Sequence, residues 1–161
     1  MDRSLSRRRW LTALASGAGA LLVACQSSGS VTELNTPEGR VLQYEADDLI
    51  ILVSGFQPSY RVGDALQVNL MVNNQTRGEA QVKLRTKLLG QGGQPVVQAE
   101  PAVLSVKPQD ASSVDQTLPL GRNLVPGSYT LSVEVPPWRL NGRESGPGTT
   151  LRAQVQLTAS D

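Results

Sequence analysis

The sequence contains no histidine and a single cysteine, Cys25, among its 161 residues. Ser-His-Asp and Cys-His nucleophilic sites are therefore excluded, as are nearly all zinc sites built on imidazole and thiolate. Histidine is also the side chain that most often transfers protons near neutral pH. A lone cysteine cannot form an internal disulfide, so packing must stabilise the fold.

The carboxylates do not replace the missing histidine. Asp47 and Asp48 are the only adjacent pair, and neighbours on a strand point to opposite faces, so the two would not converge as an acid–base dyad. No EF-hand-like spacing marks a calcium loop, and no glycine-rich loop precedes a helical pattern that would cradle phosphate. We therefore expect a protein that is not an enzyme and has no cofactor and no metal site.

The net charge of +1 conceals two segments of opposite sign. The first 24 residues carry four arginines and one aspartate, which leaves eleven basic and thirteen acidic residues in the remainder. Nucleic-acid binding needs clustered Lys and Arg to neutralise phosphates. The only basic row, Lys83, Arg85 and Lys87, lacks interleaved aromatic residues and is interpreted as a solvated strand face. We expect no nucleic-acid partner.

An export signal is indicated at the N-terminus. Arginines between residues 3 and 9 precede an apolar run over residues 10–24, which has the length of a secretory signal and is short for a membrane-spanning helix. The run ends in Leu22, Val23, Ala24 and Cys25. We therefore predict that residues 1–24 are a removable signal peptide.

These last four residues resemble the lipobox of bacterial lipoproteins. The resemblance implies that the thiol of Cys25 receives a diacylglyceryl group and that cleavage makes Cys25 the first residue. An acylated Cys25 would anchor the chain in the lipid bilayer, since each buried CH₂ contributes about 0.8 kcal/mol. We thus expect a lipid-anchored protein of the bacterial cell envelope, facing the periplasm or the exterior. An ordinary cleavage site beside a free thiol is the alternative.

The arginine cluster also resembles the twin-arginine export signal. Arg7 and Arg8 take the paired positions, and Trp10 and Leu11 take the following apolar ones, although Trp10 stands where phenylalanine is usual. The general secretory route remains open, because any arginine-rich N-terminus satisfies it.

Residues 25–43 are predicted to be a flexible tether. They are rich in Ser, Gly, Thr, Asn and Pro and show no sustained period, except that the last few, from Val41, are compatible with an edge strand. Fifteen such residues would reach about 50 Å when extended. The folded domain is then expected over residues 44–161.

The remaining chain alternates between short strand patterns and turn clusters. Residues 49–56 form an apolar run typical of a strand buried on both faces, and alternation of period two follows over residues 66–73, 80–88, 129–135 and 151–157. No segment shows a helical period. Seven or eight short strands in this length predict an all-β fold, an antiparallel β-sandwich of two sheets.

The order of strands and turns resembles the immunoglobulin-like modules of bacterial envelope proteins. In such folds a tyrosine anchors a corner through its hydroxyl, and Tyr129, which follows Pro126-Gly127-Ser128, matches that position. A barrel closed from the same strands is the structural alternative.

The least regular segment, residues 136–148, is the candidate binding loop. It contains Trp138, the only tryptophan after the signal, together with Arg139 and Arg143, and Asn141-Gly142 favours a tight hairpin turn. Trp and Arg are enriched at interface hot spots, so these three residues are candidate partner-binding residues. The competing interpretation is that Trp138 covers one end of the core.

We thus expect a non-catalytic binding, scaffolding or accessory module with an envelope protein as partner. The alternatives are an inhibitor of an envelope enzyme that acts through residues 136–148, and a carbohydrate-binding module. Three coplanar exposed aromatic rings would favour the carbohydrate module, and a protruding proline-rich loop would favour the inhibitor. A flat apolar edge strand would favour a protein partner by strand addition.

Overall fold

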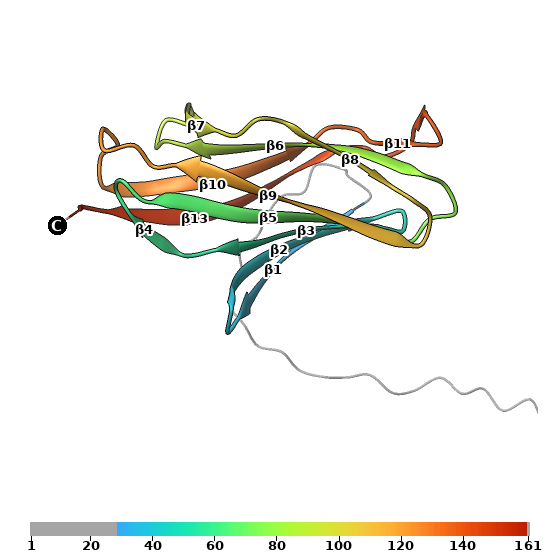
Figure 1. Cartoon of the computed structure of the whole chain (residues 1–161), viewed down its shortest axis with the longest axis horizontal. Helices are drawn as coiled ribbons and strands as arrows, with labels where there is room; N and C mark the ends of the chain where they lie inside the picture. Colours follow the sequence, from blue (N-terminus) through green and yellow to red (C-terminus); the bar gives the residue numbers. More distant parts are fainter. Residues whose placement is uncertain (1–28, 161) are drawn as a thin grey trace, which may run out of the picture.

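The computed structural model describes residues 29–160, which fold into thirteen strands in two open sheets packed face to face (Figure 1). No helix of this described part is long and apolar enough to cross a membrane. The first sheet contains β1 (Ser30–Thr36), β2 (Gly39–Ala46), β3 (Leu49–Phe56), β5 (Ala65–Asn74) and β9 (Asp110–Pro119), in that order. The second sheet contains β4 (Ser59–Arg61), β6 (Ala80–Leu89), β7 (Pro95–Gln98), β8 (Ala102–Val106), β10 (Gly127–Val135), β11 (Arg139–Leu140), β12 (Arg143–Glu144) and β13 (Thr149–Thr158).

The predicted immunoglobulin-like sandwich is confirmed by the topology. Strands β3, β5 and β9 lie side by side in one sheet, and β6, β10 and β13 lie side by side in the other, which is the ABE and CFG arrangement of that fold. The chain switches sheets after β3, so that β4 pairs with the end of β13 in parallel; the other pairings are antiparallel.

Period-two alternation places the core between the sheets. On β6, Ala80, Val82, Leu84, Thr86 and Leu88 are buried, and the residues between them face outward, as predicted. The core also takes Leu49, Ile51 and Val53 from β3. The prediction that residues 49–56 are buried on both faces is wrong, because Ile50 and Leu52 lie on the uncovered outer face of the first sheet and are half-buried.

Tyr129 forms the predicted corner. Its hydroxyl donates a hydrogen bond of 2.7 Å to the carbonyl oxygen of Val125, four residues upstream at the entry to β10. This bond fixes the approach of the chain to the strand, as in the tyrosine corner of immunoglobulin-like folds.

The expected tether is wrong for residues 30–43. Strands β1 and β2 pair along their whole lengths, from Ser30 opposite Glu45 to Thr36 opposite Gly39, and form a hairpin that projects from one side of the sandwich (Figure 1). The physical reason is that Leu42 and Tyr44 of β2 are buried, so the core extends beyond β3 and holds the hairpin in place. This hairpin, with the very short strands β4, β7, β11 and β12, accounts for the excess over the seven or eight strands predicted.

Candidate functional site

Trp138 lies inside the molecule and not on a binding surface. Its side chain is 1% exposed, and its ring meets the Tyr44 ring edge to face, with 6.1 Å between centroids and 72° between planes. Gly146 packs so closely beneath the indole that a Cβ at that position would lie 1.9 Å from Cε2. The prediction of Trp138 as a partner-binding residue is therefore corrected: its apolar ring closes one end of the core.

Arg139 and Arg143 stay on the surface, at the end of the sandwich opposite the C-terminus (Figure 1). They lie on β11 and β12, which are joined by a two-residue turn at Asn141 and Gly142, both with positive φ, as the sequence predicts for a tight hairpin. Asn141 fastens this turn to the start of β6, because its N–H donates to the Glu79 carbonyl oxygen at 2.9 Å and its Oδ1 accepts from the Glu79 N–H at 3.0 Å.

The aromatic side chains do not form an exposed platform within residues 29–160. Tyr44, Phe56 and Trp138 are buried, and Tyr60 and Tyr129 are half-buried. Burial, reinforced by the negative charge of Asp47, raises the pKa of the Tyr44 phenol. Burial also raises the pKa of Tyr60, although the hydrogen bond that its hydroxyl accepts from the Gln57 N–H opposes this shift.

Asp47 and Asp48 were expected on a strand, but they form the turn between β2 and β3. Both are exposed and have positive φ, 50° and 61°, as the tight turn of a twisted hairpin requires. No group of three or more Asp, Glu, His or Cys side chains within residues 29–160 is arranged to hold a metal ion.

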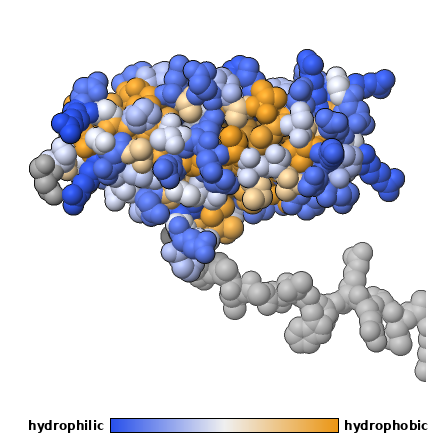
Figure 2. Space-filling model, viewed as in Figure 1, coloured by the Kyte–Doolittle hydropathy of each residue, from blue (hydrophilic) through white to orange (hydrophobic). Residues whose placement is uncertain are grey.

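The surface that sequence reasoning missed is the free edge at β1. All seven residues of this strand are exposed, and it pairs only with β2, so every second residue turns its backbone N–H and C=O toward the outside. Val31 is 53% exposed and Leu34 is 44% exposed. Hydrophobic and polar residues both reach the surface of the projecting hairpin (Figure 2).

The other edges of the described sheets differ from β1 in length, composition or neighbours. In the second sheet β4, β7 and β12 are only three, four and two residues long, and β7 begins with a proline. In the first sheet β9 carries Asp110 and Asp115, and β8 packs beside it. Short strands, prolines and charges are the usual protections of a sheet edge, and β1 has no proline and no lysine.

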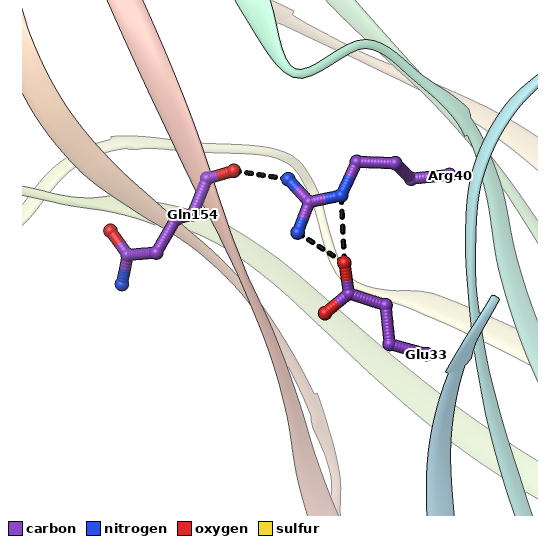
Figure 3. A network of polar contacts seen from close by, with 3 residues as sticks. All are labelled: Glu33, Arg40 and Gln154. Atoms are coloured by element: carbon purple, nitrogen blue, oxygen red, sulfur yellow. Dashed lines mark hydrogen bonds and ion pairs between the residues drawn. The ribbon is translucent and has the colours of Figure 1, made fainter. Parts of the chain in front are cut away.

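Arg40 holds the hairpin against the second sheet (Figure 3). Its guanidinium donates to Oε1 of Glu33 from Nε at 2.8 Å and from Nη2, and Nη1 donates to the backbone carbonyl oxygen of Gln154 on β13. The guanidinium carbon lies 5.6 Å from the centroid of the Phe56 ring. The only charge on β1 is thereby paired within the chain.

A depression of about 380 Å³ lies where the chain passes from β7 to β8, along residues 98–101. The hydroxyl of Thr86, fully buried beneath it, has no hydrogen-bond partner among the described residues. Gln116, on the other side of this segment, donates from Nε2 to the Glu100 carbonyl oxygen at 2.7 Å. The buried polar groups at this place are an uncharged hydroxyl and an uncharged amide.

The predicted signal and anchor residues lie outside the described residues. These are the recognition residues Arg7, Arg8, Trp10 and Leu11, the lipobox residues Leu22, Val23 and Ala24, and the lipid site Cys25.

A sequence signal for the β1 edge does exist. Val31, Thr32 and Thr36 are β-formers, and the following Pro37-Glu38-Gly39 is a turn signal before the alternating residues of β2. The serine- and glycine-rich stretch before residue 31 favours a linker, and that composition concealed the hairpin.

No protein-family model and no curated protein matches the chain. Solved structures with a similar arrangement include a β-glucosidase from Listeria innocua in complex with glucose, with 15% identity, a TM-score of 0.49, and coverage of 68% of this chain and 16% of that chain. A family 123 glycoside hydrolase from Clostridium perfringens has 14% identity and a TM-score of 0.47, over 65% of this chain and 23% of that chain. The chain thus spans less than a quarter of either protein, and these likenesses carry no argument about activity.

Proposed function

We propose that the chain is a lipid-anchored lipoprotein of the bacterial cell envelope whose sandwich is a non-catalytic binding module. In this proposal acylated Cys25 holds the domain in the bilayer, and the edge of β1 receives a protein partner by strand addition. The observation that carries the proposal is an edge strand of seven exposed residues without proline, lysine or an unpaired charge.

The position of the edge supports a role close to the membrane. The described domain begins at Gly29, which packs so tightly on the Tyr44 ring that a Cβ there would lie 2.4 Å from Cε2. Four residue steps separate Cys25 from Gly29, a reach of about 14 Å at most. The sandwich would therefore lie close to the lipid surface and not at the end of a flexible tether of about 50 Å.

The two alternative functions have less support. A carbohydrate-binding platform needs exposed planar rings, and three of the five aromatic side chains of the described domain, Tyr44, Phe56 and Trp138, are buried. An inhibitory loop over residues 136–148 would lack Trp138 as an anchor, because that ring belongs to the core.

The anchor is tested by palmitate labelling and membrane fractionation of wild type and Cys25→Ser. Wild type is expected to take up label and to sediment with membranes, and the variant is expected to do neither. A wild-type chain without label, recovered free of membranes, would contradict the anchor.

The edge is tested by photocrosslinking in intact cells from position 34 on β1. Position 103 on β8 is the matched control, since Val103 is also an exposed strand residue, 55% accessible. A defined adduct is expected from position 34 only. Equal crosslinking from both positions would show that the edge has no special role.

A further inference from the structure

We infer that the protein partner of the β1 edge is a second copy of the same chain, joined antiparallel, β1 to β1, about a twofold axis at Leu34. This inference rests on the proposed function, because it names the partner of the edge described above. It would join the two five-stranded sheets into one continuous sheet of ten strands.

Symmetry limits the possible registers of such a pair. Residues directly opposite each other lie on the same face of a sheet, so a twofold axis between identical strands must pass beside a residue that faces its own copy. An axis at Glu33 would bring two carboxylates together, and an axis at Thr32 would set Leu34 opposite a serine. Both registers lose cross-strand complementarity.

An axis at Leu34 gives a self-complementary pairing. Leu34, 44% exposed in the monomer, then packs on Leu34 of the second copy. Thr32 faces Thr36, and Glu33 faces Asn35, in both halves of the pair. Apolar pairs, threonine pairs and hydrogen-bonding pairs are the favourable cross-strand combinations.

The contacts of Glu33 within its own chain leave one of its carboxylate oxygens available to the second copy. Both bonds from Arg40 end on Oε1, as Figure 3 shows, so Oε2 can accept the side-chain N–H of Asn35 from the second copy. The paired guanidinium also removes the net charge that would otherwise repel another edge strand.

Anchoring in a membrane would allow so small an interface to hold two copies together. With the axis at Leu34, five residues of each strand, 32–36, pair with the other copy, and they bury less than the roughly 1,000 Å² expected of a stable complex in solution. Anchoring both copies in one bilayer raises their effective concentration without any new contact. A twofold axis perpendicular to the bilayer also places both anchors on the same side of the pair.

The test is disulfide crosslinking of the full chain in membranes, with cysteines introduced on β1. Leu34→Cys is expected to give a crosslinked dimer, because opposite residues in a sheet have Cα atoms within disulfide range, about 4.4–6.8 Å. Thr32→Cys alone would place the two thiols four residues apart, about 14 Å, and is expected to give at least about tenfold less dimer. Differently tagged Thr32→Cys and Thr36→Cys chains expressed together should form the mixed dimer.

The outcomes separate this inference from the proposed function. Palmitate-labelled Leu34→Cys chains without a crosslink would overturn the β1 pairing and leave the anchor intact. As much dimer from Thr32→Cys alone as from Leu34→Cys would overturn the register. A disulfide dimer of the wild-type chain would instead reveal a free Cys25 thiol and contradict the anchor.

Discussion

Replacement of Asn74 is expected to destabilise the sandwich strongly. Asn74 is fully buried at the end of β5. Its Nδ2 donates to the carbonyl oxygens of Gly78 at 2.8 Å and Val106 at 2.9 Å, and its Oδ1 accepts from the N–H of Thr76 at 3.0 Å and the hydroxyl of Thr76 at 2.6 Å. One side chain thus joins the β5–β6 turn to the end of β8.

The expected loss of stability is worked from these four bonds, the shortest of the five that the Asn74 side chain makes. A hydrogen bond contributes about 1 kcal/mol net, so their loss in Asn74→Ala corresponds to about 4 kcal/mol. Thr76 is only half-buried, so its N–H and hydroxyl can recover hydrogen bonds to water, and this offsets part of the loss. We therefore expect a loss of about 3 kcal/mol in the free energy of unfolding, a large part of the 5–15 kcal/mol typical of a domain.

Urea denaturation of the Cys25→Ser chain, followed by tryptophan fluorescence, measures this loss. Asn73→Ala is the matched control, because Asn73 is the half-buried neighbour on the outer face, and its effect should stay within about 0.5 kcal/mol. Equal effects of the two variants would refute the role of the Asn74 network.

Asn74→Asp provides a second test through pH. The introduced carboxylate would face carbonyl oxygens in a buried site, which raises its folded-state pKa. The contribution of the introduced carboxyl to stability is fully present below its pKa in the unfolded chain, about 3.9. This contribution is lost as the pH rises toward the higher pKa of the folded state. This variant should approach wild-type stability at pH 4 and fall below it at pH 7, and a pH-independent deficit would contradict the reasoning.

Three further predictions concern the core and its closure. Gly146→Ala should cost several kcal/mol, since its Cβ would overlap the Trp138 ring, whereas Gly93→Ala, with nothing within 4 Å and only a positive φ to strain it, should cost about 1–3 kcal/mol in the same assay. Tyr129→Phe removes the corner bond to Val125 and should lower the unfolding free energy by about 1 kcal/mol; an unchanged urea midpoint would contradict this role. The raised pKa of Tyr44 stabilises the fold below about pH 10, and this contribution is lost as the pH rises further, so Tyr44→Phe should lose less stability than wild type between pH 8 and pH 11.

The sandwich could be predicted because the residue pattern that produces each strand lies within the strand itself. A strand between a core and solvent must alternate with period two, and the alternation on β6 and β13 can be read directly from the chain. The Asn141-Gly142 turn and the Tyr129 corner were predictable for the same reason, since each depends on a few neighbouring residues.

The strand structure of residues 30–43 and the burial of Trp138 both depend on contacts with distant parts of the chain. The hairpin of β1 and β2 forms because Leu42 and Tyr44 find core partners, and the composition of the segment contains no information about those partners. Trp138 is equally suited to a surface hot spot and to a core, and packing on Tyr44 and Gly146 decided between them.

The sequence by itself determined the alternation of the strands, the chemistry that is missing from the chain, and the resemblance of residues 22–25 to a lipid-attachment signal. Only the tertiary structure decided which strand edge is left exposed. The exposure of β1 follows from its place at the end of the first sheet, where it pairs only with β2, and from the Arg40 contacts that hold the hairpin beside β13.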